Sequence, residues 1–349
     1  MPIKYKEINC KRVLDSFRIL DTRLWTRHCF DPYNNCEFNC VYCNLGTQKH
    51  KESQDSSVPV HVKINAPQIL AKELTMLKRK GVVSLGVATD PYQPAEKKYH
   101  ITRQILETLN KHNCPFAIGT KSDLILQDLN LISEASKKSW CCISLSITTL
   151  DENLAKLLEP NAPSPKRRLE TVRRLTEKGI TTGIWLVPTL PYVTDSNENI
   201  APVIEAAVES GAKFVLGGTL DMRNQVGFKK FLEEHFPQLA PKYKRLYKKM
   251  DTSCMYYPDE SYLYDLYKRF ISLCQKYGVE RYIPHFHTRR QAWLFYTRNL
   301  SLFNETPIFG LTQLLNYLSP SRELLQTLRI RSDSSLSNGI LKVLHYFPH

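Results

Sequence analysis

Two hydrophobic patterns alternate along the chain from about residue 67. In one, apolar residues recur every three or four positions, as in an amphipathic helix. In the other, short apolar runs rich in β-branched residues indicate buried strands. The helical pattern covers residues 67–81, 102–113, 128–138, 165–179 and 197–211. The strand pattern covers residues 82–89, 115–121, 140–148, 181–191 and 213–221, with a further strand expected within residues 24–32.

This alternation predicts an α/β fold with a parallel sheet, as a barrel or as an open doubly wound sheet. A dinucleotide-binding fold has little support, because no G-x-G-x-x-G follows the first strand and the pair Gly217-Gly218 falls in the last one. Functional residues of parallel α/β folds lie at the carboxyl ends of the strands. That rule directs attention to residues 89–90, Lys121, residues 146–148 and residues 188–190.

The pattern changes after residue 222, where the alternation of strands and helices ends. A long helical pattern covers residues 261–278, and a shorter one covers residues 322–330. We therefore predict two parts. A barrel domain with its N-terminal segment covers residues 1–222, and a mainly helical extension that packs on the barrel covers residues 223–349.

The composition is that of an ordinary globular protein, since 42% of the residues are hydrophobic and 23% are charged. No apolar run approaches the roughly 18–20 residues that a membrane helix needs. The first 16 residues contain no apolar stretch typical of a secretory signal. These features predict a cytoplasmic protein with no membrane partner.

The chain carries 48 Lys and Arg residues against 34 Asp and Glu residues, a formal net charge of +14. Such an excess favours polyanionic partners, nucleic acid above all. A generally basic, solvated surface would give the same count, so charge alone leaves both interpretations open.

The densest chemical signal is the segment NNCEFNCVYC at residues 34–43, which contains Cys36, Cys40 and Cys43. In a reducing compartment such a cluster is more typical of a metal site than of disulfides. A [4Fe–4S] cube is normally held by four cysteines, so three would leave one iron open to a substrate or cofactor. A structural zinc site also needs four ligands. The candidates for a fourth, none with the paired spacing of a zinc finger, are His28, Cys29 and His50.

The spacing C-x3-C-x2-C, with an aromatic residue before the last cysteine, follows a predicted strand and precedes a run of βα units. This arrangement resembles the radical S-adenosylmethionine (SAM) superfamily. The resemblance implies a partial (β/α)6 barrel of the TIM type, with a [4Fe–4S] cluster on Cys36, Cys40 and Cys43. It also implies that SAM chelates the open iron and that a donor such as ferredoxin or flavodoxin reduces the cluster. Cleavage of SAM would then give a 5′-deoxyadenosyl radical that abstracts hydrogen from the substrate.

Longer stretches resemble the spore photoproduct lyase family and its uncharacterised relatives over roughly residues 28–222. The most telling stretch is residues 158–170, which begins with Leu-Glu-Pro and ends with Arg-Leu-Glu. The other stretches are residues 87–97, 119–132, 144–180 and 187–195.

The same resemblance implies four residues that contact SAM. Tyr42 would lie near the adenine, Thr89 stands where the lyases carry a serine, and Lys121 ends a strand where the lyases hold SAM. Ser146 lies on the fourth strand, and by the two-residue period of strands it faces inward together with Ser144. Ordinary structural roles, such as aromatic packing or a lysine on the barrel rim, would suit the same positions.

One position departs from the lyases, which place a hydrogen-donating cysteine two residues before the serine that Thr89 replaces. The matching residue here is Val87, which has no thiol hydrogen to give. Reversal of a DNA lesion by the lyases' own route is therefore in question. Cys29 is the first candidate for a substitute donor, and the alternatives are Tyr33, Tyr42 and Tyr92.

Three further groups of residues could contact a polyanion or a metal. His285 and His287, next to Arg289 and Arg290, indicate a polar rim, because two histidines without a third ligand make a poor metal site. The basic residues of the helix at 165–179 are expected on a solvated outer face, and they are Lys166, Arg167, Arg168, Arg173 and Arg174. The group that could bind a nucleic-acid strand is Lys242, Tyr243, Lys244, Arg245, Tyr247, Lys248 and Lys249.

We therefore consider three functions. The first is a radical SAM enzyme that acts on nucleic acid, in lesion repair or base modification, and it rests on the family resemblance and the charge of +14. The second is a radical SAM enzyme that modifies a protein, a peptide or a small metabolite, and it rests on Val87 and the looser match after residue 222. The third is a zinc or iron–sulfur protein without enzymatic activity.

Overall fold

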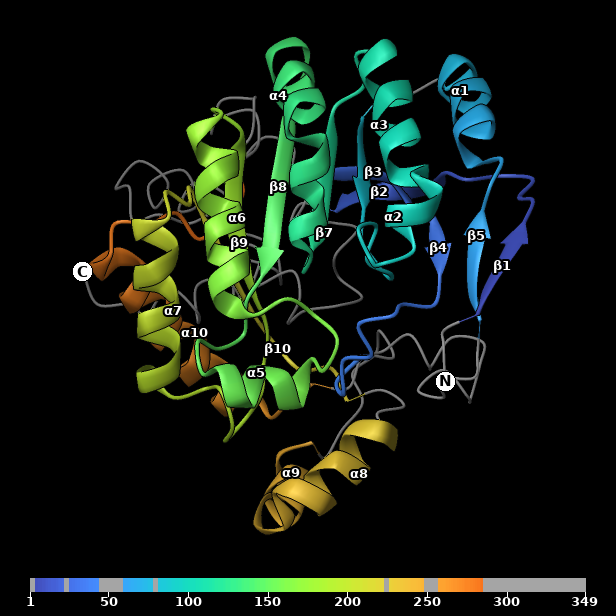
Figure 1. Ribbon diagram of the computed structural model, residues 1–349. Helices are drawn as coiled ribbons and strands as arrows, with labels where there is room; N and C mark the ends of the chain where they lie inside the picture. Colours follow the sequence, from blue (N-terminus) through green and yellow to red (C-terminus); the bar gives the residue numbers. More distant parts are fainter. Residues whose placement is uncertain are drawn as a thin grey trace, which may run out of the picture. The chain divides into compact units, whose positions relative to one another are not determined.

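The computed structural model describes six segments of the chain, residues 4–21, 25–43, 59–77, 81–222, 226–247 and 257–284. These segments fall within one compact unit that extends over residues 1–292. The helices and strands of this unit are labelled in Figure 1.

A seven-stranded sheet forms the centre of this unit, with its strands in the order β10-β9-β8-β7-β6-β3-β2. Neighbours from β3 to β10 are parallel, and β2 pairs antiparallel with β3. Because β10 and β2 stand at opposite ends of the order, the described strands form an open, partial barrel. The strands are β2 (Asp15–Asp21), β3 (Thr26–Phe30), β6 (Val82–Leu85), β7 (Phe116–Thr120), β8 (Cys141–Ser146), β9 (Thr181–Thr189) and β10 (Val215–Thr219).

The partial barrel and its six parallel strands were predicted from the sequence and are confirmed. Each strand is shorter than the apolar run that predicted it. The run at residues 82–89 shows the reason, since β6 ends at Leu85 and the rest of the run forms a loop at the carboxyl end of the strand.

Helices cover the outer face of the sheet (Figure 1). They are α1 (Ala66–Met76), α2 (Glu96–Tyr99), α3 (Ile101–Lys111), α4 (Leu129–Lys138), α6 (Pro165–Glu177) and α7 (Asn197–Glu209), whereas α5 (Glu152–Leu158) lies beyond the carboxyl ends of the strands. The five predicted helices, α1, α3, α4, α6 and α7, are confirmed. Local sequence sets the ends of α6: Ser164 caps it with its side chain, Pro165 fills its first turn, and Gly179 follows with a left-handed φ of 76°.

The two faces of the central strands carry different side chains. Those that face the helices are apolar and belong to one buried cluster, the helix-side core, which includes Leu85, Ile105, Leu109, Ile118, Ile143 and Val172. On β6, β7 and β8 the opposite face carries small side chains, which are Ser84, Ala117, Gly119, Cys142, Ser144 and Ser146. On these three strands the inward face is therefore small, as the two-residue period predicted for Ser144 and Ser146. The ring of Trp185, on the same face of β9, packs against Gly119.

A second sheet has three strands, in the order β1-β5-β4, and the sequence analysis did not predict it. These strands are β1 (Tyr5–Ile8), β5 (Val60–Lys63) and β4 (Tyr33–Asn34). The two-residue strand β4 ends just before Cys36. The small sheet therefore fixes where the cysteine-bearing segment begins.

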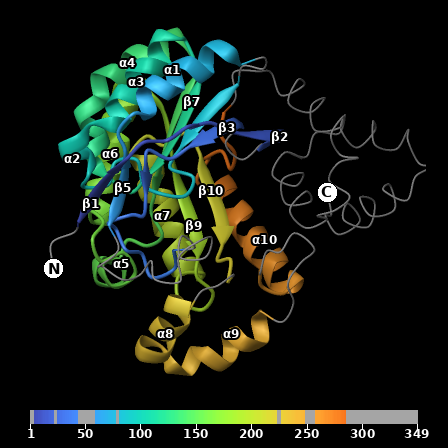
Figure 2. The same ribbon diagram turned by 90° about the vertical axis from the view of Figure 1, so that its right-hand side faces the viewer.

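Helices follow residue 222, as predicted, and they are α8 (Val226–His235), the short 3-10 helix η3 (Pro237–Leu239), α9 (Ala240–Leu246) and α10 (Glu260–Lys276). Helices α8 and α9 lie beyond the carboxyl ends of the strands, and α10 runs beside β10 (Figure 2). The division at residue 222 stays a prediction, and the predicted helix at 322–330 lies outside the described residues. Within the described segments no helix is long and apolar enough to cross a membrane.

Candidate functional site

Cys36, Cys40 and Cys43 lie on one short loop that follows β4, which we call the cysteine loop (residues 35–43). Asn35 and Asn39 adopt left-handed φ values of 67° and 50°, and the N–H of Cys43 donates to the carbonyl of Cys40 at 3.0 Å. Asparagine tolerates this conformation better than most residues. The loop therefore turns tightly enough to keep three thiols on one short segment.

The cysteine loop packs into a second buried cluster, the loop-side core. Its members are Phe38, Cys40, Tyr42, Leu158, Leu190, Leu220, Met222, Phe228, Phe231, Leu232, Leu239, Tyr243, Leu246 and Tyr247. Leu190 and Leu220 directly follow β9 and β10, so the loop lies at the carboxyl ends of the strands. Helices α8 and α9 form the opposite side of this core. The sequence analysis assigned these residues only to a helical extension packed on the barrel.

Glu37 anchors the first half of the loop. Its backbone N–H donates to Gln93 Oε1 at 3.1 Å, and its carboxylate accepts from the N–H of Ala95 at 2.6 Å and from the Tyr5 hydroxyl at 3.0 Å. Its carbonyl accepts from Asn161 Nδ2 at 2.8 Å. The loop is thereby tied to the small sheet and to the segments that follow β6 and α5.

Glu159 and Arg168 anchor the second half. The N–H of Val41 donates to the carbonyl of Leu158 at 2.9 Å, and the Tyr42 hydroxyl donates to Glu159. Arg168 Nη1 lies 2.5 Å from Glu159 Oε2, and both residues are only 1% exposed. The expectation that Arg168 lies on a solvated face was wrong, because this side chain points inward to a buried carboxylate.

Lys121 follows β7 and brings a positive charge to the loop. Its Nζ lies 4.0 Å from Glu159 Oε1 and 5.6 Å from the centre of the Tyr42 ring. Burial acts to lower the pKa of this ammonium, but the negative charges of the Cys40 thiolate and the Glu159 carboxylate outweigh burial and raise it. Across the described residues Nζ makes no hydrogen bond, so a charged group with available donors faces the site.

The loop after β6 is held by Asp31. The N–H groups of residues 86–88 donate to its carboxylate at 3.0–3.1 Å. Burial raises the pKa of Asp31 to about 6, although these amide bonds lower it. The Thr89 hydroxyl donates to the carbonyl of Tyr33 at 2.7 Å, and the side chain of Val87 is 48% exposed. Thr89 is therefore engaged within the loop, whereas Val87 faces open space.

Gly86 allows this loop to approach its neighbour. Its φ is 81°, and a Cβ at this position would come within 2.0 Å of the Gly119 carbonyl oxygen. Only glycine fits such a contact in this backbone conformation. The close approach brings the ends of β6 and β7 together at the site.

Asp90 joins those two strand ends. Its carboxylate accepts from the Thr120 hydroxyl at 2.6 Å and from the N–H groups of Lys121 at 2.7 Å and Tyr92 at 2.9 Å. Its backbone amide also opposes the rise that burial causes in the pKa of the Cys36 thiol. Asp90, to which the strand-end rule had directed attention, thus connects Lys121 to the cysteine loop.

Ser146 ends β8 on the inward face, pairs with Trp185 of β9 and is 6% exposed. Two residues later, the hydroxyl of Thr148 is buried and has no hydrogen-bond partner among the described residues. Buried hydroxyls normally have a partner. The strand-end rule had directed attention to residues 146–148 without giving Thr148 a role, and its unpartnered hydroxyl after β8 leaves a polar atom available to a bound group.

A comparison with models of protein families identifies the superfamily of proteins that carries this site. The model of the radical SAM superfamily matches residues 30–216, more than half of the chain. The chain belongs to the radical SAM superfamily. The sequence-based recognition of this family is thereby confirmed.

Several proteins are similar to this radical SAM protein. An uncharacterised protein of Mycobacterium tuberculosis is 29% identical over 285 residues, which cover 79% of this chain and 82% of that protein. The radical SAM Nalpha-GlyT isomerase of Pseudomonas phage M6 is 23% identical over 189 residues, 53% of this chain and 38% of that protein. A solved structure of spore photoproduct lyase, complexed with dinucleoside spore photoproduct, has a TM-score of 0.61 at 13% identity and covers 78% of this chain and 79% of that chain. This last likeness concerns the fold.

The superfamily uses a [4Fe–4S] cluster and SAM. Cys36, Cys40 and Cys43 would supply the three thiol ligands of the cluster, although among the described residues no three His, Cys, Asp or Glu side chains already lie close enough together to hold a metal ion. Burial raises the pKa of the Cys36 thiol well above its ordinary value, and the backbone amides of Phe38 and Asp90 oppose that rise. Burial raises the pKa of the Cys40 thiol to about 12, and the Lys121 ammonium opposes that rise. Metal binding replaces the thiol proton, so a buried thiol beside a cation is a suitable ligand.

The hydrogen-donor candidates are placed less favourably. The Tyr33 hydroxyl donates to Glu96, and the Tyr92 hydroxyl donates to Asp128 at 3.0 Å. Both tyrosines are fully buried, and burial together with these carboxylates raises the pKa of each phenol. Cys29 lies on β3 and is half-buried. Donation by either tyrosine would require its bond to a carboxylate to break.

The basic and aromatic segment after residue 240 differs from expectation. Tyr243 and Tyr247 are 3% exposed, and their hydroxyls donate to the carbonyls of Pro191 at 2.7 Å and Leu220 at 3.0 Å. These tyrosines are core residues and present no ring to a nucleic-acid strand. Lys242, Lys244 and Arg245 are exposed, whereas Lys248 and Lys249 lie outside the described residues, as do His50, His285 and His287.

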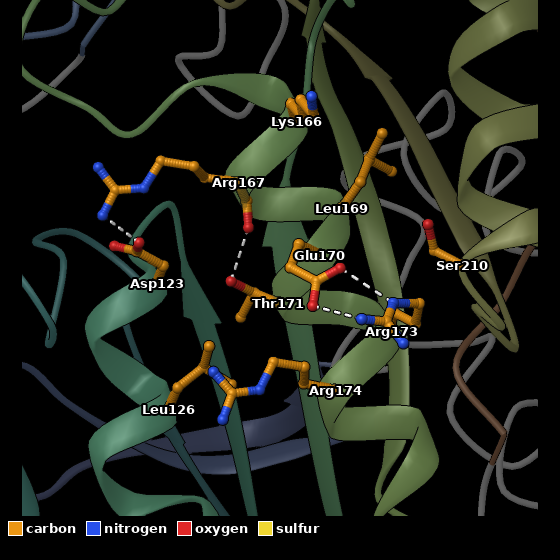
Figure 3. A pocket seen from close by; sticks show the side chains of 10 residues that line it. All are labelled: Asp123, Leu126, Lys166, Arg167, Leu169, Glu170, Thr171, Arg173, Arg174 and Ser210. Atoms are coloured by element: carbon orange, nitrogen blue, oxygen red, sulfur yellow. Dashed lines mark hydrogen bonds and ion pairs between the residues drawn. The ribbon is translucent and has the colours of Figure 1, made fainter.

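The outer side of α6 carries a surface groove of about 520 Å3, shown in Figure 3. Arg167 pairs there with Asp123, and Arg173 forms two bonds to Glu170 at 2.6 and 2.9 Å. Apart from Arg168, the basic residues of this helix thus form the solvated face that was expected. The groove is built from η2 (Asp123–Asp128), α6 and Ser210, and none of the cysteines lines it.

Proposed function

We propose that this radical SAM enzyme acts on a nucleic acid, in base modification or lesion repair. The observation that carries the proposal is the exposed cationic surface of α8 and α9, whose helices form one side of the loop-side core. Its cationic members are Lys229 and Lys230 on α8 and Lys242, Lys244 and Arg245 on α9. The exposed Glu233 and Glu234 offset the two lysines of α8, whereas α9 contains no acidic residue. A basic surface beside the reactive centre, on a chain of charge +14, supports binding of a phosphate backbone.

The residues of the site would share the work as follows. Cys36, Cys40 and Cys43 hold the cluster, and the Lys121 ammonium binds the carboxylate of SAM. When bound, the cluster and SAM supply one-electron cleavage to a 5′-deoxyadenosyl radical that takes a hydrogen atom from the substrate. Tyr42 would border the adenine, while Thr89 and Ser146 fix the strand ends around the cofactor. The loop-side core excludes water from the cysteine loop on the side of α8 and α9.

Val87 bears on the kind of reaction. Its exposed apolar side chain stands where the resemblance to the lyases calls for a thiol. Either another residue donates hydrogen to the substrate radical, or the reaction needs no hydrogen donor. This supports a transformation other than the lyases' own. Cys29 stays the first candidate for a donor, ahead of Tyr33 and Tyr92.

Binding measurements test the substrate class. Single-stranded and duplex DNA and RNA would be titrated into the reconstituted enzyme with SAM at several salt concentrations. We expect affinity to fall with salt, and neutralising Lys242, Lys244 and Arg245 with glutamine should flatten the slope of log K against log salt by roughly 0.7–0.9 per lost phosphate contact. The matched control neutralises Lys166 and Arg174 on the outer side of α6, where the slope should stay unchanged.

The second candidate is a protein, peptide or small-metabolite substrate, which Val87 favours because the lyase thiol is missing. If nucleic acid binds weakly and without dependence on salt, the first proposal fails and this candidate takes its place. The formation of 5′-deoxyadenosine, with and without nucleic acid, distinguishes the two. Nucleic acid should stimulate SAM cleavage only if it is the substrate.

A further inference from the structure

We propose that the buried pair of Glu159 and Arg168 positions the cysteine loop and sets the reduction potential of the cluster that the loop carries. Neither residue is a ligand of the cluster, so both are positioning residues. The inference rests on membership of the radical SAM superfamily. It does not depend on which substrate the enzyme takes.

The segment around Glu159 holds the cysteine loop at three points. Asn161 Nδ2 donates to the carbonyl of Glu37 at 2.8 Å, and the carbonyl of Leu158 accepts from the N–H of Val41 at 2.9 Å. The Tyr42 hydroxyl donates to Glu159. These contacts lie between the first and the last cysteine, so movement of this segment would displace the thiols relative to one another.

Arg168 in turn ties Glu159 to the rigid part of the barrel. Its Nε donates to the carbonyl of Pro163 at 2.8 Å, its Nη1 donates to the carbonyl of Ser146 at 2.9 Å, and the same Nη1 lies 2.5 Å from Glu159. Ser146 belongs to β8, and Arg168 belongs to α6. A continuous series of contacts therefore runs from the sheet through Arg168 and Glu159 to Tyr42.

The charges of Glu159 and Arg168 also act on the cysteine loop. Both side chains are 1–2% exposed, and charges in such surroundings are screened far less than on the surface. In the intact pair they nearly cancel. Removing only the carboxylate leaves a positive charge beside the loop, which favours the reduced, more negative cluster. Removing only the guanidinium leaves a negative charge, which disfavours reduction.

The test uses the reconstituted enzyme and three variants, Glu159→Gln, Arg168→Met and the double variant. A redox titration followed by electron paramagnetic resonance gives the midpoint potential of each. We expect Glu159→Gln to shift the potential upward, Arg168→Met to shift it downward, and the double variant to return near the original value. Simple damage to the fold would move both single variants in the same direction, and that result, or no shift in either, overturns the proposal.

A second measurement needs no cofactor. Hydrogen exchange in the apo-protein reports the order of the cysteine loop, and we expect residues 36–43 to exchange at least about tenfold faster in Arg168→Met. The neighbouring control Arg167→Gln, which removes an exposed cation from the same helix, should leave exchange and potential unchanged. Unchanged exchange in Arg168→Met would contradict the positioning role.

The single variants leave a buried unpaired charge and can fail to fold. In that case the double variant, which has no such charge, is compared with Tyr42→Phe, which loses only one hydroxyl. Faster loop exchange in Tyr42→Phe, with an unaltered helix-side core, supports the proposal. Equal exchange in Tyr42→Phe and the unmodified protein refutes it.

Discussion

The two buried cores of this enzyme are built from different side chains. The helix-side core, between the sheet and its covering helices, is mainly aliphatic and includes Leu85, Ile105, Leu109 and Ile118. The loop-side core lies between the strand ends and helices α8 and α9. It contains six tyrosine or phenylalanine rings and one of the three cysteine ligands, Cys40. Its phenol groups need partners, and Tyr42, Tyr243 and Tyr247 each donate to one.

The two cores therefore have different roles: the helix-side core stabilises the barrel, and the loop-side core also fixes the positions of the thiols. Aliphatic packing between sheet and helices stabilises the barrel without directional demands, so many apolar side chains of suitable volume would serve there. The loop-side core combines apolar contacts with fixed hydrogen bonds to one loop, so each change there alters the geometry of the thiols. Substitutions in the two cores should therefore give distinguishable phenotypes.

The largest effect is expected for Cys40→Ala. Loss of one of three thiol ligands should abolish the cluster and all formation of 5′-deoxyadenosine, because the cysteine loop has no fourth cysteine that could replace Cys40. The free energy of unfolding should change by only about 1 kcal/mol, since the helix-side core is untouched. Iron analysis, SAM cleavage and urea unfolding measure the three quantities. Full cleavage activity in this variant would refute the assignment of the cysteine loop as the cluster site.

Phe228→Ala and Leu109→Ala compare the cores directly. Both side chains are fully buried, so the substitutions should destabilise the protein by about 3–5 and 2–5 kcal/mol respectively. Only Phe228→Ala, which opens a cavity against the cysteine loop, should also lower the iron bound per chain after reconstitution. Equal loss of iron in both variants at the same residual stability would mean that the cores are not functionally distinct.

Lys121→Met should separate SAM binding from cluster binding. The methionine keeps most of the buried volume but removes the ammonium, and a hydrogen bond to a charged group contributes about 1.5–3 kcal/mol. The Kd of SAM should therefore rise roughly 10- to 150-fold, while the absorbance of the cluster stays the same. Lys166→Met, an exposed lysine of α6, is the matched control. A normal Kd in Lys121→Met would remove this residue from the SAM site.

The barrel could be predicted because its signals are local. Hydrophobic period, a capping serine, an initial proline and a terminal glycine each act within a few residues, and they located α6 and its neighbours. The three cysteines could be found in the same way, since their spacing lies within one loop. The small sheet escaped prediction because β4 has only two residues and its partner β5 follows after a long interval.

Other features depended on contacts between distant segments. Arg168 stands among exposed cations on α6, but its side chain points inward to Glu159. Both residues belong to the Leu-Glu-Pro stretch, yet no local sequence pattern indicates that they pair. For Tyr243 and Tyr247 the signal was present. Leu246 and Tyr247 follow Tyr243 by three and four residues, which is the helical period, and all three are buried at the end of α9, with Tyr247 directly after the helix. The helical period should have outweighed the mixture of basic and aromatic residues.

The smallest effect is expected on the outer side of α6, where Arg173 pairs with Glu170 and Glu177. All three side chains are about half exposed, so water and salt screen these pairs, in contrast to the buried pair of Arg168 one turn earlier. Arg173→Gln should leave the urea midpoint and the rate of SAM cleavage unchanged within error, and any small difference should vanish at high salt. If Arg173→Gln impaired SAM cleavage as strongly as Arg168→Met, the burial of Arg168 would not explain its importance. The outer face of α6 would then have to affect the reaction by another route.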